Sequence, residues 1–203
     1  MILDLLAPPL CWSCGAPAAR DGPLCPACRR ALRFLGPAPV VLCGLEVWAP
    51  LAYDCPAGDL VRALKFHGAT RIARAMAALI VANAPGAMLA GDLVPVPLHP
   101  ARRRARPFNQ AALIGSAISG RTGLGLADCL RRAGPDRRQV GRGRVARLTG
   151  PGAIEAAGRP PPTALLVDDV VTTGATLAAC AAALREAGSE RIRAIAFART
   201  AGR

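Results

Sequence analysis

Aromatic side chains are scarce in this sequence, since Phe, Tyr and Trp make up only 3% of its 203 residues. Proteins that bind single-stranded nucleic acids by base stacking place several such rings on one surface, so a stacking platform of that kind is disfavoured. Hydrophobic residues make up 52% of the chain, which excludes disorder over its whole length.

Lysine is scarcer still, because Lys65 is the only lysine among 26 basic residues and the others are arginine. Acidic residues number 13, which leaves a net charge of +13. The planar guanidinium of arginine binds phosphate through two parallel hydrogen bonds, so this composition favours a polyanionic ligand or partner. A GC-rich genome, which favours the codons for arginine, is an equally good explanation of the raw count.

The sequence also lacks a hydrophobic run that could cross a bilayer. Its longest uncharged stretch, residues 75–91, is interrupted by Asn83, Pro85 and Gly86. Near the N-terminus, Asp4 lies where a signal peptide would carry positive charge. These observations predict a cytoplasmic protein without membrane insertion, in which thiols stay reduced and tend to bind metal.

Four of the eight cysteines form two closely spaced pairs: Cys11, Cys14, Cys25 and Cys28. Two residues between thiolates let one turn aim both sulfurs at a tetrahedral ion, and a second such turn completes the shell. We therefore expect a closed, structural zinc site. Disulfides and a thioredoxin-like redox pair are weaker alternatives, given the reducing compartment and the doubled motif. The remaining four are predicted to be buried, inert thiols: Cys43, Cys55, Cys129 and Cys180.

The order of predicted elements indicates an α/β fold. Residues 1–36 are expected to form the cysteine module, ending in a short basic helix over 29–34, and residues 40–203 a second domain. Apolar runs predict strands over 40–51, 92–97, 163–167 and 191–198. Helical spacing and caps predict helices over 58–66, 70–82, 110–120 and 174–187. This alternation implies a parallel sheet with helices on both faces.

Residues 102–147 are unusually basic, with twelve arginines against Asp128 and Asp136. A solvated surface would explain such a run. A region that contacts phosphates explains the imbalance better.

The most informative stretch, residues 165–176, is an apolar strand that ends in Asp168 and Asp169 and continues into a turn rich in threonine. Ligands of open α/β sheets bind at the carboxyl ends of the strands, and a helix N-terminus favours phosphate. We therefore expect a phosphate monoester against residues 172–176. The two acids suit a vicinal diol or the waters around Mg²⁺. A phosphate and a diol held close together describe a ribose 5-phosphate.

This stretch resembles the signature of type I phosphoribosyltransferases that binds 5-phosphoribosyl 1-diphosphate (PRPP). Together with the cysteine pairs and residues 64–68, 94–100 and 106–110, it makes the chain similar to the ComF family, which includes competence proteins associated with DNA uptake. The resemblance implies a type I phosphoribosyltransferase fold with a small N-terminal zinc-ribbon-like module. It also implies Mg²⁺ with PRPP, and single-stranded DNA and a competence helicase as partners.

Site residues follow from the same resemblance. It assigns a catalytic role to Asp168 and Asp169. The PRPP loop would comprise Val170, Thr172, Thr173, Gly174, Ala175 and Thr176. Diphosphate or flap contacts would come from Lys65, His99, Arg102, Arg104 and Arg106. An ordinary helix-end lysine and a solvated histidine are the alternatives for two of these.

The sequence departs from the family pattern at Pro107, where members usually have glycine, and Cys43 and Cys55 cannot make the second cysteine ribbon that many members carry. Three functions remain open: an accessory protein that handles nucleic acid, a catalytic phosphoribosyltransferase of unknown acceptor, and a nutrient-utilisation protein. The acceptor itself cannot be read from these residues.

Overall fold

The computed structural model describes residues 9–18, 22–67, 70–98, 108–132 and 153–200. Its main sheet has six strands in the order β1-β2-β8-β7-β4, with β3 also paired to β8. The strands are β1 (Val40–Leu42), β2 (Leu45–Trp48), β3 (Leu51–Ala52), β4 (Asp92–Pro95), β7 (Thr163–Val171) and β8 (Arg191–Arg199). All pairings are parallel except that of β1 with β2. The predicted α/β fold with a mostly parallel sheet is therefore confirmed.

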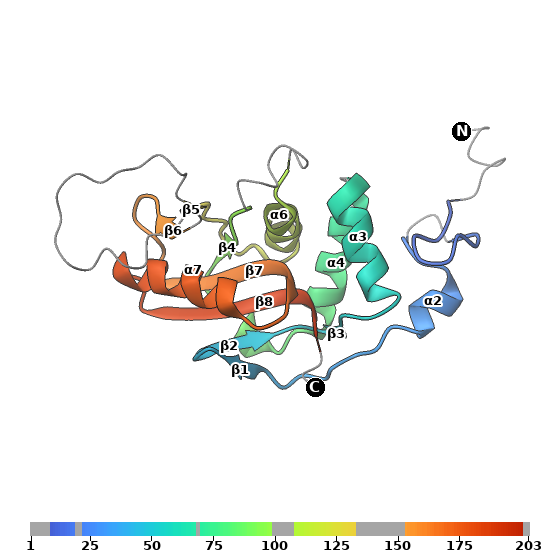
Figure 1. The fold of residues 1–203 in the computed structure, drawn as a ribbon, viewed down its shortest axis with the longest axis horizontal. Coiled ribbons are helices and arrows are strands. Elements are labelled where there is room, and N and C mark those ends of the chain that lie inside the picture. Colours follow the sequence, from blue (N-terminus) through green and yellow to red (C-terminus); the bar gives the residue numbers. More distant parts are fainter. Residues whose placement is uncertain (1–8, 19–21, 68–69, 99–107, 133–152, 201–203) are drawn as a thin grey trace.

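Helices cover both faces of this sheet, as expected from the strand and helix order (Figure 1). The helices are α2 (Pro26–Arg30), α3 (Ala57–His67), α4 (Thr70–Asn83), α6 (Gln110–Thr122) and α7 (Ala175–Glu186), with a 3₁₀ turn η1 (Gly86–Met88). Side chains of α3, α4 and α6 share one hydrophobic core, and those of α7 belong to a second core on the opposite face. Asn109 caps α6, since its side chain accepts a hydrogen bond from the backbone N–H of Ala111.

Strand β7 lies at the centre of the sheet, between β8 and β4. Successive side chains of a strand point to opposite faces. Leu165 and Val167 accordingly pack in the core beneath α3, α4 and α6, and Leu166 packs beneath α7. Pairing with β8 continues as far as Val171, four residues beyond the predicted strand. The two acids thus lie inside the strand, where backbone pairing fixes their positions.

The predicted single strand over 40–51 is instead three short strands. Cys43 and Gly44 both have positive φ, 50° and 73°, and this turn folds β1 back on β2. Because an isolated apolar run gives no sign of such a turn, only glycine at position 44 could have indicated it.

A separate hairpin, β5 (Leu130–Arg132) with β6 (Ile154–Ala156), was not predicted. Each strand has three residues, too few to show a periodic pattern, and 21 residues separate the two in the sequence. The hairpin packs against α7, adding Leu130 and the partly buried Ile154 to its core.

The helix expected at residues 29–34 is wrong in its placement. Helix α2 begins at Pro26, with Cys25 as its N-cap, and ends at Arg30. Proline suits the first position of a helix because its missing N–H would have no partner there. Phe34 instead forms a β-bridge with Leu51. The division into a module over 1–36 and a domain over 40–203 remains a prediction.

Within the part of the chain that the structure describes, no helix combines the length and apolar character needed to cross a membrane.

Candidate functional site

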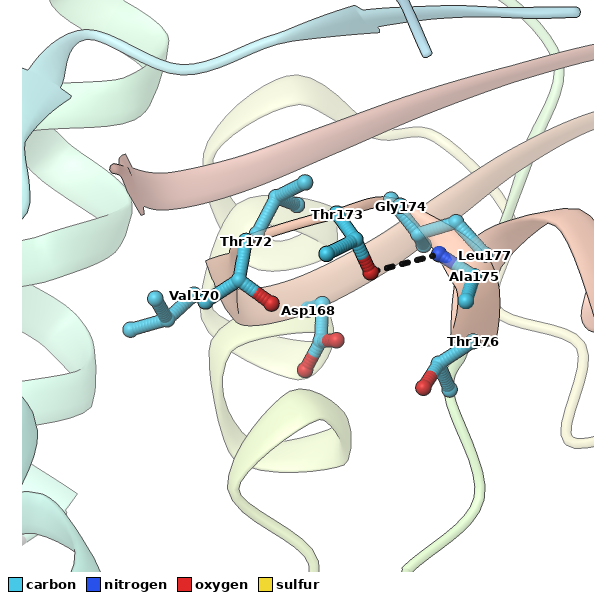
Figure 2. Close-up of a pocket in the computed structure, with 9 residues that line it drawn as sticks. Asp168, Val170, Thr172, Thr173, Gly174, Ala175, Thr176 and Leu177 are labelled. Carbon is cyan, nitrogen blue, oxygen red and sulfur yellow. Dashed lines mark hydrogen bonds between the residues drawn. The ribbon is translucent and has the colours of Figure 1, made fainter. Parts of the chain in front are cut away.

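The turn between β7 and α7 forms one wall of a small pocket of about 250 Å³ at the carboxyl end of the sheet. Asp168 and residues 170–177 line it. Figure 2 shows the carboxylate of Asp168 and the hydroxyls of Thr172 and Thr176 around one open space. All three threonines of the turn are exposed, so their hydroxyls are accessible to a ligand. The pocket therefore combines hydroxyl donors, a helix N-terminus and one carboxylate.

Gly174 shapes this turn. Its φ of +81° is a left-handed conformation that side chains with a Cβ rarely adopt, and it is the N-cap of α7. The hydroxyl of Thr173 accepts a hydrogen bond from the backbone N–H of Ala175 at 3.4 Å. The other N–H groups of the first helical turn have no partner within a helix, by the geometry of any helix start. They favour an anion at this position.

The tip of the β1–β2 hairpin supports the turn from outside. A Cβ added to Gly174 would lie 2.8 Å from the Cβ of Leu42, and the thiol of Cys43 donates to the carbonyl of Thr173 at 3.5 Å. These contacts join residues about 130 positions apart, so no local pattern in the sequence could have indicated them. They place the tip of the β1–β2 hairpin directly against the turn.

The two adjacent acids face different surroundings. Asp168 lines the pocket on the side of α7, and its side chain accepts a hydrogen bond from the backbone N–H of Asp169 at 2.8 Å. Asp169 is buried, with its carboxylate 3.1 Å from the ammonium of Lys65 on α3. Both acids were predicted to bind the ribose hydroxyls. Asp168 lines the pocket and Asp169 does not, and the ribose-binding role of both acids stays a prediction.

Burial and, after it, the negative charge of Asp169 raise the pKa of Asp168, which is about 7 once all its surroundings act together. The backbone N–H of Asp169 and the positive charges of Lys65 and Arg132 lower this pKa, without offsetting those two effects. A carboxyl group with such a pKa is a frequent feature of functional sites.

Arg132 is a residue near the site that the sequence motifs did not single out. It lies on β5, its Nε donates to the carbonyl of Pro97 at 3.1 Å, and its charge acts on Asp168. The side chain of Asn109 donates to the carbonyl of Val96 at 3.0 Å and so joins α6 to the same loop. The only sequence signal for a place of Arg132 near the site is its position within the basic segment 102–147.

Lys65 is the one predicted diphosphate contact whose side chain the structure describes, and it pairs with Asp169. The other four, together with Pro107, lie outside the described residues: His99, Arg102, Arg104 and Arg106. Their contacts with diphosphate stay predictions.

The four paired cysteines come together in the N-terminal module. The sulfur atoms of these four residues all lie within 4.8 Å of one another: Cys11, Cys14, Cys25 and Cys28. Tetrahedral sulfur ligands about 2.3 Å from zinc lie about 3.8 Å apart, close to the 3.6 Å between Cys14 and Cys25. Gly15, with φ +73°, closes the first turn, and the backbone N–H of Cys28 donates to the sulfur of Cys25. The donor set fits a closed, structural zinc site.

Charge considerations also fit a cation between these sulfurs. Burial works against ionisation of Cys11, but hydrogen bonds from the backbone N–H groups of Cys14, Cys25 and Ser13 lower its pKa to about 6. Hydrogen bonding with Cys14, followed by burial, raises the pKa of Cys28 to about 12. Without a cation the four thiols cannot all ionise, and a divalent metal would remove this conflict.

The prediction for the other four cysteines is confirmed for two and wrong for two. Cys129 and Cys180 are buried, and burial raises the pKa of both. Cys43 and Cys55 are exposed. Each lies in a turn whose contacts are polar: the thiol of Cys55 donates to Asp59 at 3.0 Å, and Cys43 contacts the β7–α7 turn.

Comparisons with known proteins support the module. Residues 2–59 match the double zinc ribbon domain family. That range contains Cys43 and Cys55 as well, but among the described residues only the four paired cysteines gather into a cluster. The N-terminal segment is therefore a zinc-binding cysteine module with one such cluster in its described part.

No protein of curated function matches the sequence significantly. Among solved structures, one described as the allosteric regulatory enzyme of purine biosynthesis is similar, at 17% identity and a TM-score of 0.39. The similarity covers 61% of this chain and 24% of that one, so this chain matches about a quarter of the other's length.

Proposed function

We propose that this chain binds PRPP together with Mg²⁺ at the carboxyl end of β7. The observation that carries the proposal is the pocket in which Asp168 faces the turn of residues 172–176. An anion at the start of α7 and a hydroxyl-bearing group beside Asp168 are the two parts of a sugar phosphate.

Each part of the ligand has a chemically suitable partner. The 5-phosphate would accept hydrogen bonds from the first N–H groups of α7 and from the hydroxyls of Thr172 and Thr176. A ribose hydroxyl would donate to Asp168. Arg132, placed between the loop after β4 and Asp168, would interact with the diphosphate as a fixed positive charge. Mg²⁺ bound to the diphosphate would neutralise charge that develops when this group leaves.

The proposal is tested by titration calorimetry of the chain with PRPP and Mg²⁺. A hydrogen bond to a charged group contributes about 1.5–3 kcal/mol, so Thr176→Val should weaken binding by about tenfold or more. Thr163→Val, at the opposite end of β7, is the matched control and should leave the affinity unchanged. Absence of binding by the unaltered chain at millimolar PRPP would contradict the proposal.

A catalytic role would require an acceptor that attacks C1 of the bound sugar and displaces diphosphate. The protein's contribution would then be electrostatic, through Arg132 at the leaving group and Asp168 at the ribose. Release of diphosphate on addition of candidate bases or amines to the PRPP complex is the direct assay. Release from the unaltered chain but not from Asp168→Asn would support a phosphoribosyltransferase.

A second candidate function is single-stranded DNA handling, as in the ComF proteins of DNA uptake, with a helicase as a partner. The net charge of +13 and the similarity of residues 2–59 to a zinc ribbon favour it. Binding through arginine and phosphate releases counterions, so affinity for single-stranded DNA should fall steeply between 50 and 200 mM salt, by about 300-fold for six contacts. An affinity independent of salt would contradict this candidate function.

A further inference from the structure

Lys65 occupies an unusual position for the only lysine of the chain. It lies in the last turn of α3, and its ammonium is 3.1 Å from a carboxylate oxygen of Asp169 on β7. Its side chain is 20% exposed and that of Asp169 is 11% exposed. Every other basic residue is arginine, whose planar fork is larger than the compact ammonium of lysine. The contact is a single ion pair, to which a point charge is suited.

This ion pair differs from the other ion pairs of the described residues, which join arginines to acids near the surface. The arginine side chains of those pairs are 42–59% exposed: Arg33 with Asp54, Arg62 with Asp59, and Arg193 with Glu46. Taking two charges out of water costs free energy that their attraction offsets only in part, so a buried pair is weak evidence for stability. A role for the Lys65–Asp169 pair is better sought in the site beside it.

The pair lies on the opposite side of β7 from the pocket. Asp168 points toward α7 and the threonine turn, whereas Asp169 points toward α3. Two adjacent carboxylates repel each other and would also repel the phosphates of PRPP. The ammonium of Lys65 offsets one of these negative charges from the far side of the strand, where it does not occupy space in the pocket.

We propose that Lys65 is a positioning residue of the PRPP site, which acts through Asp169 by fixing its carboxylate and offsetting its charge beside the ligand. The inference rests on the proposed function. It differs from direct contact between Lys65 and a phosphate, because all of its effect passes through Asp169.

A double-mutant cycle measured by PRPP–Mg²⁺ calorimetry separates these two roles. Lys65→Met should weaken PRPP binding by about tenfold, because it leaves Asp169 charged and unpaired beside a polyanion. In the Asp169→Asn background, which has no such charge, the same substitution should have no further effect. Lys65→Arg, which restores a positive charge, should recover part of the affinity. Inorganic phosphate, which lacks the ribose and carries less negative charge than PRPP, should lose clearly less affinity than PRPP does in Lys65→Met.

Arg62→Met is the matched control, since it removes one positive charge from α3 a single turn earlier and should leave PRPP affinity unchanged. Thermal melting of every variant separates lost folding from lost binding, and the double variant keeps the test valid if Lys65→Met alone unfolds. Additive effects of the two substitutions, or equal loss of phosphate and PRPP affinity, would overturn the inference alone. No PRPP binding by the unaltered chain would overturn the proposed function, and this inference with it.

Discussion

The cysteine module and the carboxyl end of β7 lie in one chain but are stabilised differently. Among the described residues of the module four are buried, and two of them are the cysteines Cys11 and Cys25. At β7, in contrast, Leu165, Leu166 and Val167 have no exposed surface and pack in cores on both faces of the sheet. We therefore expect the folding of the module to depend on a bound metal, and that of the sheet to depend on hydrophobic burial.

This difference explains where each region tolerates polar and charged groups. The well-packed sheet accommodates two adjacent acids, one paired with Lys65 and one with a raised pKa, because its core supplies the stability that they lower. The described part of the module has only four buried residues to offset such costs, and we expect its sulfurs to serve a structural role. Chemistry is thus expected at the sheet, and metal-dependent folding at the module.

Removal of the metal should have the largest effect and should be confined to the module. Structural zinc contributes about 10–16 kcal/mol to the folding of small zinc domains. We expect one zinc per chain by elemental analysis, lost in Cys11→Ser and in Cys25→Ser. Hydrogen exchange should then show unprotected amides in residues 9–32 and unchanged protection in β7. Zinc-free protein purified without chelator, or loss of protection in both regions together, would contradict the conclusion that the two regions are stabilised differently.

Asp168→Asn should stabilise the protein and do so only at higher pH. A carboxyl group whose pKa is about 7 in the folded state and about 3.8 in the unfolded state is destabilising once the pH exceeds the lower value. The cost therefore grows as pH rises from about 4 to about 7, to about 4 kcal/mol. Urea unfolding should show this gain at pH 8 and little of it at pH 4. The exposed Asp128→Asn is the control, and an equal gain from both variants would contradict the interpretation.

Gly174→Ala should destabilise the protein by about 2 kcal/mol, because a Cβ in this left-handed conformation would also meet Leu42 at 2.8 Å. Gly120→Ala is the control within a helix, where no heavy atom lies within 4 Å of the added Cβ, and should be stabilising by about 0.5–1 kcal/mol. Denaturant unfolding measures both. If Gly174→Ala were neutral, the turn would not be held by the β1–β2 hairpin.

Ser13→Ala tests the contact between the two regions and should have the smallest effect, about 1 kcal/mol. The hydroxyl of Ser13, between Cys11 and Cys14, donates to Asp59 on the first turn of α3 at 2.5 Å. Thermal melting of Ser13→Ala, compared with the exposed Ser116→Ala, measures the contribution of this bond. Equal melting temperatures for the two variants would mean that the module and α3 are independent.

Much of the fold could be predicted from local patterns. The apolar run before Asp168, the cap at Asn109 and the order of strands and helices predicted the parallel sheet. The cysteine spacing predicted the cluster of four sulfurs, because a two-residue separation fixes the geometry of each pair. In each case the signal lies within a few residues of the feature.

What could not be predicted depends on contacts between distant residues. Lys65 and Asp169 are 104 positions apart, and nothing in the spacing indicates that they form a pair. The same holds for Cys43, which the sequence suggested to be a buried thiol and which instead contacts the carbonyl of Thr173. The unequal environments of Asp168 and Asp169 are likewise set by the packing of α3 and α7 against opposite faces of β7.

A crystal structure of the chain with PRPP and Mg²⁺ tests the central claim most directly. The account predicts the 5-phosphate against the backbone N–H groups and hydroxyls of residues 172–176, with a ribose hydroxyl within hydrogen-bond distance of Asp168. Electron density for PRPP at any other place, with the threonine turn empty, would contradict it.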